Sequence, residues 1–501
     1  MRSCFDGEPE TEDVGVCSAG TQTCGASGSW GPCLDQVLPG VEQCGDTSDD
    51  DCDGRVSCGE SERVSVFGSG SHELAHDVAI DADGTRYVTG FYRESMSFGG
   101  LPLPSVNGTR DLFLLALDES GEHRFSLGII SDAHLNPAVV AAQDGAVICA
   151  TVSSDIQLPD GSVLPSAGGS DMLVARFDAR GELIWAPRLG GPATDQASAV
   201  AFAPDGSVVV TGWTQGAIEL GTFSYEAPAE HYDVFVARIS PNGTITDARA
   251  FTGSDDQVTR AITVAPGGEI YLGGYLEGSV DFGGGELSSL GDRYVFVVTL
   301  DADLNHLWTA RFGDAELERL FTVNVDSAGD VVVTGRFVGS LPFGDPLVAP
   351  SGGSAGFVAK LSPDGEPRWS RALAGDASAA LYGATITAAD DIVVTGYYEG
   401  DATLADDDVS LSLPTAGILV PNIVVAKLNA AGRPLWARAD RVQGEQDVGG
   451  AFRAWRKIAS RGEALVLVGS FADTAWFQGV DGEEMIESMG GHDAFVAELS
   501  H

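Results

Sequence analysis

A repeated phrase constrains this chain more than any other feature. The stretch 77–92, DVAIDADGTRYVTGFY, centres on Val88-Thr89-Gly90, and related sequences recur along the chain at steps of about sixty residues. The matching positions are Gly90, Ala150, Gly212, Gly274, Gly335, Gly396 and Gly469. A period of this kind indicates a repeat architecture in which neighbouring units share one extended core.

Each unit contains four runs that are typical of β-strands. In the third unit they cover 199–203, 208–213, 233–239 and 244–251, and tight turns, Pro204-Asp205-Gly206 and Pro241-Asn242-Gly243, join the first pair and the last pair. The third run is the clearest along the chain, as in DLFLLAL at 111 and DVFVARI at 233. Four antiparallel strands repeated seven times predict an all-β, seven-bladed β-propeller.

The two ends of the chain are expected to complete one blade. The last unit lacks a fourth strand, and residues 62–68 lie where the fourth strand of a preceding unit belongs. Pairing of the N- and C-terminal strands would close the ring and leave no exposed edge. We therefore predict a propeller over 61–501, preceded by a separate segment over 1–60. Tryptophans of the fourth strands are expected to pack between blades: Trp185, Trp308, Trp369 and Trp436.

The charge of the chain excludes several functions. With 73 acidic and 28 basic residues the net charge is −45, which disfavours binding to nucleic acid and to anionic membrane surfaces. No apolar run is long enough for a transmembrane helix. We expect a monomer that does not insert into membranes.

The first sixty residues are rich in cysteine and poor in aliphatic side chains. Seven of the eight cysteines lie there: Cys4, Cys17, Cys24, Cys33, Cys44, Cys52 and Cys58. This density predicts a disulfide framework in a secreted or cell-surface protein. Because no signal peptide precedes it, we expect the natural chain to begin upstream. The remaining cysteine, Cys149, is expected to be a buried thiol.

The sequence 49–60, DDDCDGRVSCGE, predicts a calcium loop. It fits the D-x-D-x-D-G-x5-E pattern, in which carboxylates, one backbone carbonyl and a bidentate glutamate bind Ca²⁺ around a glycine turn. The predicted ligands are Asp49, Asp51, Asp53, Arg55 through its carbonyl, Ser57 through water, and Glu60. Its flanks are not helical, so this is a free-standing loop and not an EF-hand. The alternative is an Asp-rich solvated turn without an ion.

Both parts of the chain resemble bacterial protein families. The pieces GVC at 15, GTQTC at 20, WGPC at 30 and DCDG at 51 resemble the cysteine-rich metal-binding modules of secreted and surface proteins from myxobacteria, although RVSCGE replaces the acid-rich continuation after Gly54. DGTRYVTG at 83 and FGG at 98 and 282 resemble the bacterial β-propeller repeat (SBBP-like) family. These resemblances imply an exported propeller and no particular reaction.

An acidic residue lies at each predicted crossing between blades. Five acids share this place, Glu73, Asp132, Asp195, Asp256 and Glu318, and Asp376 and Asp447 are looser matches. They predict either a ring of carboxylates that holds cations or amines at the mouth of the channel, or a set of caps for backbone N–H groups. The crossings and the long second-to-third-strand loops share one face, which we expect to bind a protein or glycan.

No catalytic motif is present, and the histidines do not recur with the repeat. The favoured function is therefore a non-enzymatic recognition, adhesion or scaffold module. The alternative is an extracellular lyase or hydrolase acting on polysaccharide or peptide. The two differ in the channel: a scaffold should present equivalent residues from each repeat, whereas an enzyme should present a convergent, non-repeating cluster of histidine, tyrosine, arginine and acid.

Overall fold

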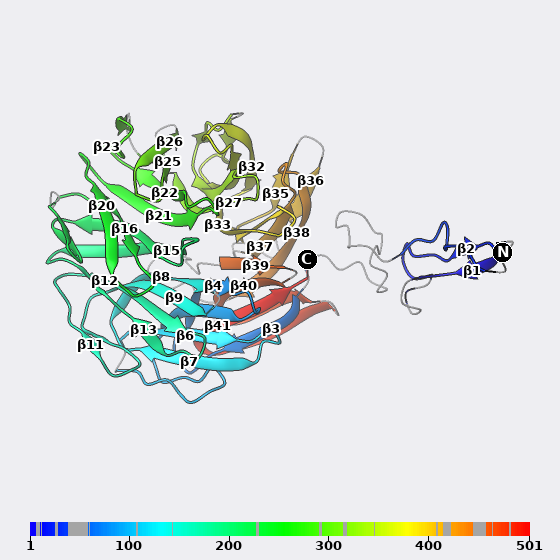
Figure 1. Ribbon diagram of the computed structural model, residues 1–501, viewed down its shortest axis with the longest axis horizontal. Helices are drawn as coiled ribbons and strands as arrows, with labels where there is room; N and C mark the ends of the chain where they lie inside the picture. The colour runs from blue at the N-terminus through cyan, green and yellow to red at the C-terminus, as the bar shows by residue number, and fades with distance from the viewer. Residues whose placement is uncertain are drawn as a thin grey trace.

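The computed structural model describes most of the chain. It covers residues 1–6, 11, 13–25, 29–38, 59, 61–106, 109–142, 144–226, 230–289, 293–313, 318–344, 346–406, 409–413, 422–443, 457–462, 464–479 and 482–500. The regular elements in these ranges are all β-strands, arranged as sheets around a common centre (Figure 1). The all-β, propeller-like prediction is thereby confirmed.

The third repeat shows how one unit folds. Its sheet has the order β15 (Thr194–Phe202), β16 (Val208–Gln215), β19 (Asp233–Ile239) and β20 (Ile245–Phe251), all antiparallel. The predicted turns are present, and Gly206 and Gly243 have φ of 80° and 85°, which glycine adopts without steric cost. The predicted start of the first strand at 199 was wrong, because β15 begins at Thr194 and a bulge at Ser198 interrupts its alternation.

The same antiparallel order recurs along the chain. The units are β4 (Leu74–Ile80), β5 (Arg86–Tyr92), β6 (Asp111–Leu117) and β7 (His123–Ile129); β8 (Ala133–Ala142), β9 (Gly145–Val152), β12 (Asp171–Asp178) with β13 (Leu183–Trp185) and β14 (Arg188–Gly190); β21 (Gln257–Val264), β22 (Ile270–Leu276), β25 (Tyr294–Leu300) and β26 (His306–Phe312); β27 (Arg319–Val325), β28 (Val331–Phe337), β31 (Ala355–Leu361) and β32 (Pro367–Gly375); and β33 (Ala379–Ile386), β34 (Ile392–Tyr398), β37 (Asn422–Leu428) and β38 (Pro434–Gln443). The first strand of each unit lies innermost (Figure 1).

Both ends of the propeller meet in one sheet. The strands β39 (Lys457–Arg461), β40 (Ala464–Gly479) and β41 (Gly482–Leu499) pair in that order, and β3 (Ser61–Phe67) pairs antiparallel with β41 from Ser61↔Leu499 to Phe67↔Ala494. The N-terminal strand thus occupies the outermost place, where other units have their own fourth strand.

Short hairpins follow the second strand of several units and reach the neighbouring sheet. They are β10 (Ile156–Gln157) with β11 (Val163–Leu164), β17 (Ile218–Leu220) with β18 (Phe223–Tyr225), β23 (Ser279–Asp281) with β24 (Glu286–Ser288), β29 (Ser340–Leu341) with β30 (Leu347–Val348), and β35 (Ala402–Ala405) with β36 (Ser410–Leu413). Two of them continue the preceding unit's sheet, because β17 pairs with β14 and β35 pairs with β32. These hairpins were not predicted from the sequence.

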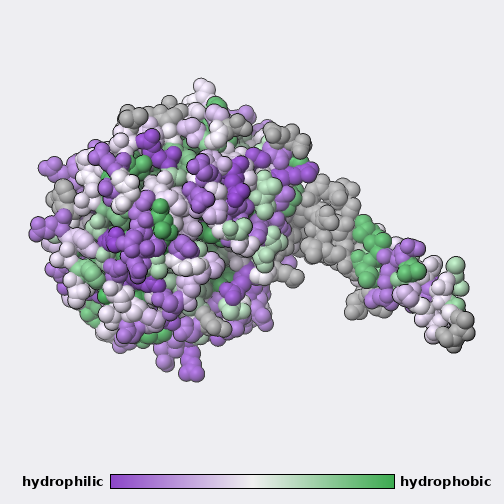
Figure 2. Space-filling model, turned by 45° about the horizontal axis from the view of Figure 1, so that its top comes forward, coloured by the Kyte–Doolittle hydropathy of each residue, from purple (hydrophilic) through white to green (hydrophobic). Residues whose placement is uncertain are grey.

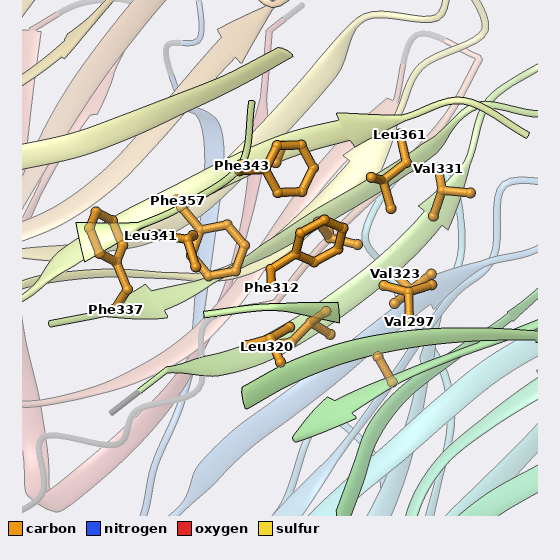
Figure 3. Packing of buried hydrophobic residues seen from close by; sticks show 14 of the residues in the cluster. Val297, Phe312, Leu320, Val323, Val331, Phe337, Leu341, Phe343, Phe357 and Leu361 are labelled. Carbon is orange, nitrogen blue, oxygen red and sulfur yellow. The ribbon is translucent and has the colours of Figure 1, made fainter. Parts of the chain in front are cut away.

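The hydrophobic core lies between neighbouring sheets. One cluster joins Val297 of β25 and Phe312 of β26 to Leu320, Val331 and Phe357 of the following unit (Figure 3). Each of these side chains is at most 8% exposed. Burial of such side chains contributes about 1.5–3 kcal/mol each, so inter-sheet packing is the main stabilising contact in the ring.

The fourth-strand tryptophans pack on the next unit, as predicted. The indole N–H of Trp185 donates to the carbonyl of Pro241, and that of Trp369 donates to the carbonyl of Ala430, at 3.0 and 3.2 Å. A Cβ added to Gly432 would lie 2.5 Å from the Trp369 ring, so only glycine fits there. Trp436 contacts Gly59 in the same way, just before β3.

The described N-terminal residues form a small unit outside the ring (Figure 1). Here β1 (Arg2–Cys4) pairs with β2 (Gly20–Gln22), and a disulfide joins Cys4 to Cys33. Figure 2 shows hydrophobic residues gathered on this unit, whose exposed apolar side chains include Leu34 and Leu38. The described residues contain no helix long and apolar enough to cross a bilayer.

Candidate functional site

The innermost strands enclose a cavity of about 210 Å³ in the centre of the ring. Strands β4, β8, β15, β21, β27, β33 and β39 all contribute to its wall. Most of the lining residues are apolar, and seven bring polar or charged groups: His76, Asp77, Ser198, Arg260, Thr322, Asn324 and Lys457. None of these seven residue types recurs at the equivalent place in another described repeat.

A β-bulge places several of these side chains. In five units the pairing of the first strand with the second strand shifts register after the second, third or fourth pair, and one residue of the first strand is skipped in the register. Five units show this shift at the same place, where the extra residue is His76, Ser198, Arg260, Phe321 or Tyr382. The same bulge therefore carries a different side chain in each of these five units.

His76, Asp77 and Lys457 are the titratable groups most changed by the cavity. Burial lowers the pKa of His76 to about 3, with a smaller effect of Arg110, so the imidazole is neutral. Burial raises the pKa of Asp77 and lowers the pKa of Lys457, while the charge of each partly opposes the effect on the other. The Asp77 carboxylate also accepts a hydrogen bond from the backbone N–H of Val139 at 2.9 Å. Perturbed groups gathered in one cavity are typical of functional sites.

An aromatic wall and one arginine complete the surroundings. The rings of Phe321 and Tyr382 lie 4.8 Å apart, and Tyr382 stacks on Tyr397 at 5.7 Å. Burial raises the pKa of Tyr397. Arg260 is half-buried, with its guanidinium 6.0 Å from the Tyr275 ring. The cavity wall thus combines the guanidinium of Arg260, the carboxyl of Asp77, the amine of Lys457 and the neutral imidazole of His76 with the ring of Phe321.

The predicted acids of the blade crossings lie apart from this cavity. Glu73 and Asp195 are fully buried and accept backbone N–H bonds from Ser69 and Gly191 at 2.8 and 2.6 Å, and Asp256 accepts one from Tyr232 at 3.1 Å. Burial raises the pKa of Asp195 to about 6. For these three acids the contacts match the capping alternative.

The other two predicted acids lie at the equivalent crossings. Asp132 precedes β8 and is partly buried, whereas Glu318 precedes β27 and is fully buried. Whether any of the five acids binds an ion stays a prediction.

One of the predicted acids belongs to a small group of possible metal ligands. Asp256, Asp255 and His231 offer ligand atoms that lie within 4.8 Å of one another, the only such group of three within the described ranges. His231 Nδ1 lies 3.5 Å from a carboxylate oxygen of Asp255, so the two already form a polar contact of their own. Asp255 is exposed.

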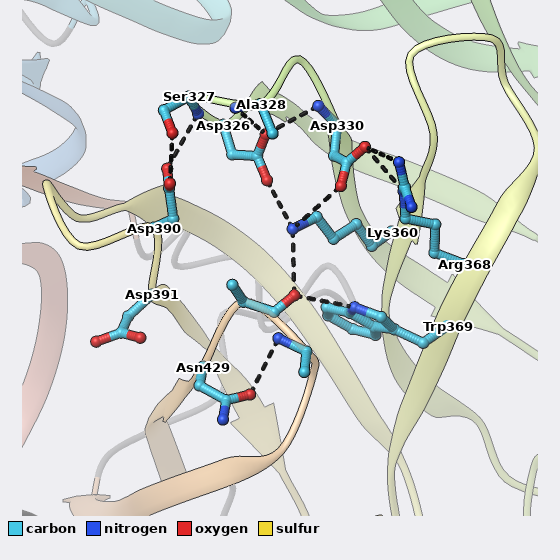
Figure 4. Close-up of polar contacts among 12 residues, drawn as sticks. Asp326, Ser327, Ala328, Asp330, Lys360, Arg368, Trp369, Asp390, Asp391 and Asn429 are labelled. Atoms are coloured by element: carbon cyan, nitrogen blue, oxygen red, sulfur yellow. Dashed lines mark hydrogen bonds and ion pairs between the residues drawn. The ribbon is translucent and has the colours of Figure 1, made fainter.

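The hairpin face carries repeated ion pairs. Lys360 of β31 lies 2.6 Å from Asp326 and 3.5 Å from Asp330, and its amine donates to the carbonyl of Ala430 (Figure 4). Other third-strand cations pair in the same way with the first hairpin of their own unit: Arg176 with Asp144, Arg238 with Asp205, and Lys427 with Asp391. Their recurrence marks them as structural contacts.

The predicted calcium loop lies outside the described residues, except for Gly59. Its six predicted ligands are therefore not placed. Among the described cysteines, Cys4 and Cys33 are bonded to each other, Cys17 is in a disulfide, and Cys24 is a free, exposed thiol. Cys149 is a buried thiol, as predicted, and burial raises its pKa to about 12.

Sequence reasoning did not find the polar residues that line the central cavity. The histidines, including His76, do not recur with the repeat, and no sequence motif contains Lys457. The strand pairing aligns Lys457 with Ala199 and Ala261, because Lys457 pairs with Val468 as these residues pair with Thr211 and Gly273. A lysine where two other units have alanine is a signal that comparison of the repeats could have found.

The sheets and their arrangement define an all-β, propeller-like protein. No family model matches the chain. The regulatory protein FlaEY of Caulobacter vibrioides is 25% identical over 334 residues, which are 61% of this chain and 33% of that protein. The uncharacterized WD repeat-containing protein L264 of Acanthamoeba polyphaga mimivirus is 27% identical over 166 residues, 30% of this chain and 12% of that protein. The matched stretches thus span a third or less of these relatives.

Two solved structures align with most of the chain at low TM-scores. A catalytically inactive virginiamycin B lyase from Staphylococcus aureus aligns with a TM-score of 0.37 and 9% identity, over 86% of this chain and 98% of its own. Sqt1 from Chaetomium thermophilum aligns with a TM-score of 0.34 and 11% identity, over 89% of this chain and 100% of its own. At these scores the similarity carries no conclusion about activity.

Proposed function

We propose that the chain forms a closed seven-bladed β-propeller whose central channel recognises one small polar ligand. The observation that carries this proposal is the set of non-repeating side chains in the channel, His76, Asp77, Arg260 and Lys457, within strands that otherwise repeat. A scaffold should present equivalent residues from each unit, so this set favours a specific ligand. The pairing of β3 with β41 supports closure of the ring.

The charges of the channel indicate the kind of ligand. In a chain with a net charge of −45, Arg260 brings a permanent positive charge to the cavity wall, and Lys457 adds an amine. Asp77 and Asn324 add hydrogen-bonding groups on the same wall. A cavity of about 210 Å³ accepts only a compact molecule. The expected ligand is a small organic anion that also carries a hydrogen-bonding group.

A thermal-shift screen of small metabolites against the full chain tests this proposal. Hits should stabilise the wild type and lose most of their effect in Arg260→Met. Arg433→Met is the matched control, because Arg433 is exposed on a hairpin turn away from the channel. Hits that stabilise Arg260→Met as strongly as the wild type would show that the ligand binds elsewhere.

A second candidate function is catalysis in the same channel. The amine of Lys457, the carboxyl of Asp77 and the neutral imidazole of His76 all line one cavity, which favours acid–base chemistry there. A lyase or hydrolase should convert some hits of the screen to products, and this conversion should fall in Asp77→Asn. Chromatography of each hit after incubation separates binding from turnover.

The N-terminal segment is proposed to be a calcium-binding head of an exported protein. The Cys4–Cys33 disulfide supports an oxidising environment. Calcium should slow proteolysis of this segment, and Asp51→Ala combined with Glu60→Ala should abolish the effect, whereas Glu10→Ala outside the motif should not. Equal proteolysis with calcium and with chelator would favour the solvated turn. The long-loop face remains the proposed surface for a protein or glycan partner of the monomer.

A further inference from the structure

Lys457 differs from the other lysines of the chain. The sequence contains three: Lys360, Lys427 and Lys457. Lys360 and Lys427 form ion pairs on the hairpin face, at 2.6 Å from Asp326 and 3.2 Å from Asp391. Lys457 instead lines the central cavity. Its amine is therefore placed to meet a molecule that enters the channel.

The surroundings of Lys457 favour a nucleophilic amine. Neighbouring strands present Val200, Ile262, Val323 and Ala384 to the same cavity. Burial among these aliphatic side chains lowers the pKa of Lys457, and a neutral amine is the form that attacks a carbonyl carbon. The charge of the Asp77 carboxylate partly opposes this effect, because it raises the pKa of Lys457. The wall thus holds an amine and a carboxyl in one small space.

Asp77 is suited to donate a proton in the same cavity. Burial raises the pKa of its carboxyl, which favours the protonated form relative to an exposed aspartate. One of its oxygens is fixed by the Val139 backbone N–H at 2.9 Å, so the orientation of the group is set by the adjacent strand β8. A backbone hydrogen bond from Val78 also acts on the carboxyl, which lines the cavity and is placed to meet a bound molecule.

We propose that Lys457 forms an imine with a small 2-oxo acid bound in the channel. This inference rests on the proposed function and specifies the ligand class of that site. The amine nitrogen adds to the ketone carbon, and the carbinolamine then loses its hydroxyl group as water after taking the proton of Asp77. The products are one water molecule, a protonated imine on Lys457 and the Asp77 carboxylate, which balances the charge of the imine.

The remaining polar groups fit the carboxylate of such a ligand. Arg260 carries a permanent positive charge on the cavity wall. Asn324 offers an amide on the same wall, and its Nδ2 donates to the Ala384 carbonyl at 3.3 Å. A cavity of about 210 Å³ limits the ligand to a short chain. Pyruvate meets these requirements and is the probe for the test.

Reductive trapping tests the proposal on the full-length protein. The chain is incubated with pyruvate and cyanoborohydride at neutral pH, and the modified sites are located by peptide mapping. Lys457 should be modified faster than Lys360 and Lys427, because burial lowers the pKa of Lys457 and the other two amines are held in ion pairs outside the cavity. Asp77→Asn should slow trapping at Lys457 and leave the N-terminal amine unaffected.

Two outcomes separate this inference from the proposed function. If pyruvate stabilises the wild type but not Arg260→Met, and Lys457 is not modified, the imine is refuted while the channel site stands. If pyruvate neither binds nor labels Lys457, and no other small anion binds in the channel, both proposals fail. Equal modification of the three lysines also refutes the imine. Lys457→Arg, which keeps the charge, should abolish labelling at that position and retain the fold by circular dichroism.

Discussion

The same substitution should destabilise the protein at one lysine and be neutral or stabilising at another. Lys360→Met removes the partner of two carboxylates on the hairpin face. The Lys360 side chain is 5% exposed, and those of Asp326 and Asp330 are 3% and 9% exposed (Figure 4). Breaking a buried ion pair costs about 3–5 kcal/mol, because an uncompensated charge is left behind. Arg368 still pairs with Asp330 at 2.8 Å, so we expect about 3 kcal/mol.

Lys457→Met should be neutral or stabilising. The lysine lies among aliphatic residues in the channel, where its charge is disfavoured, and methionine has a similar length. Replacement of a functional group that opposes stability commonly gains about 0.5–2 kcal/mol. The two stability changes differ because the surroundings of Lys360 and Lys457 differ, although both residues are lysines.

The pH dependence of the Lys457 effect has a defined sign. Its pKa is lowered in the folded state, so between that value and the unfolded value of about 10.4 the unfolded chain binds more protons. The contribution of Lys457 to stability therefore becomes less unfavourable as the pH rises through this interval. The gain from Lys457→Met should be largest below the lowered pKa and should disappear above about pH 10.4.

Equilibrium unfolding in guanidinium chloride, followed by tryptophan fluorescence, measures both variants. Lys427→Met is the control, because Lys427 and Asp391 are more exposed, at 13% and 20%, and should cost less than Lys360→Met. If Lys360→Met and Lys457→Met both destabilise the protein by about 3 kcal/mol, then Lys457 stabilises the fold as Lys360 does. That result would refute its assignment to a ligand site.

Two further predictions concern packing and thiol reactivity. Gly432→Ala should destabilise the propeller by about 2 kcal/mol or more, because a Cβ would meet the Trp369 ring and φ is 78°. Gly352→Ala is the control, since φ is 77° and the space around it is open, so it should cost only the backbone strain of about 1–2 kcal/mol. Thermal unfolding of the two variants measures the difference. In the native protein Ellman's reagent should react with Cys24, which is exposed, and not with Cys149, whose thiol is buried and has its pKa raised to about 12; rapid reaction of Cys149 would contradict the buried position.

The fold was largely predictable because each repeat carries the same strand and turn signals. Strand runs such as DVFVARI and the glycine turns near Gly206 carry local signals that each unit repeats, so errors in one unit are corrected by another. The same redundancy located β3 before the first unit. The short hairpins were not predicted, since strands of two or three residues such as β17 carry little periodicity and are formed by pairing with a neighbouring sheet.

The channel site was less predictable because it depends on a tertiary feature. A bulge at one place in five of the first strands changes which side chain faces the centre, and alternation alone does not reveal it. The recurring acids were more conspicuous in the sequence, yet Glu73 and Asp195 bind backbone N–H groups at the crossings. Repetition thus marked structural residues, and departures from repetition marked the candidate site.

A crystal structure of the full chain with a small anion selected by the thermal-shift screen tests the central claim most directly. The account predicts that the ligand lies among the innermost strands, with its anionic group beside Arg260 and its reactive carbon beside Lys457. A ligand bound only on the long-loop face, with the central cavity holding solvent alone, would contradict it.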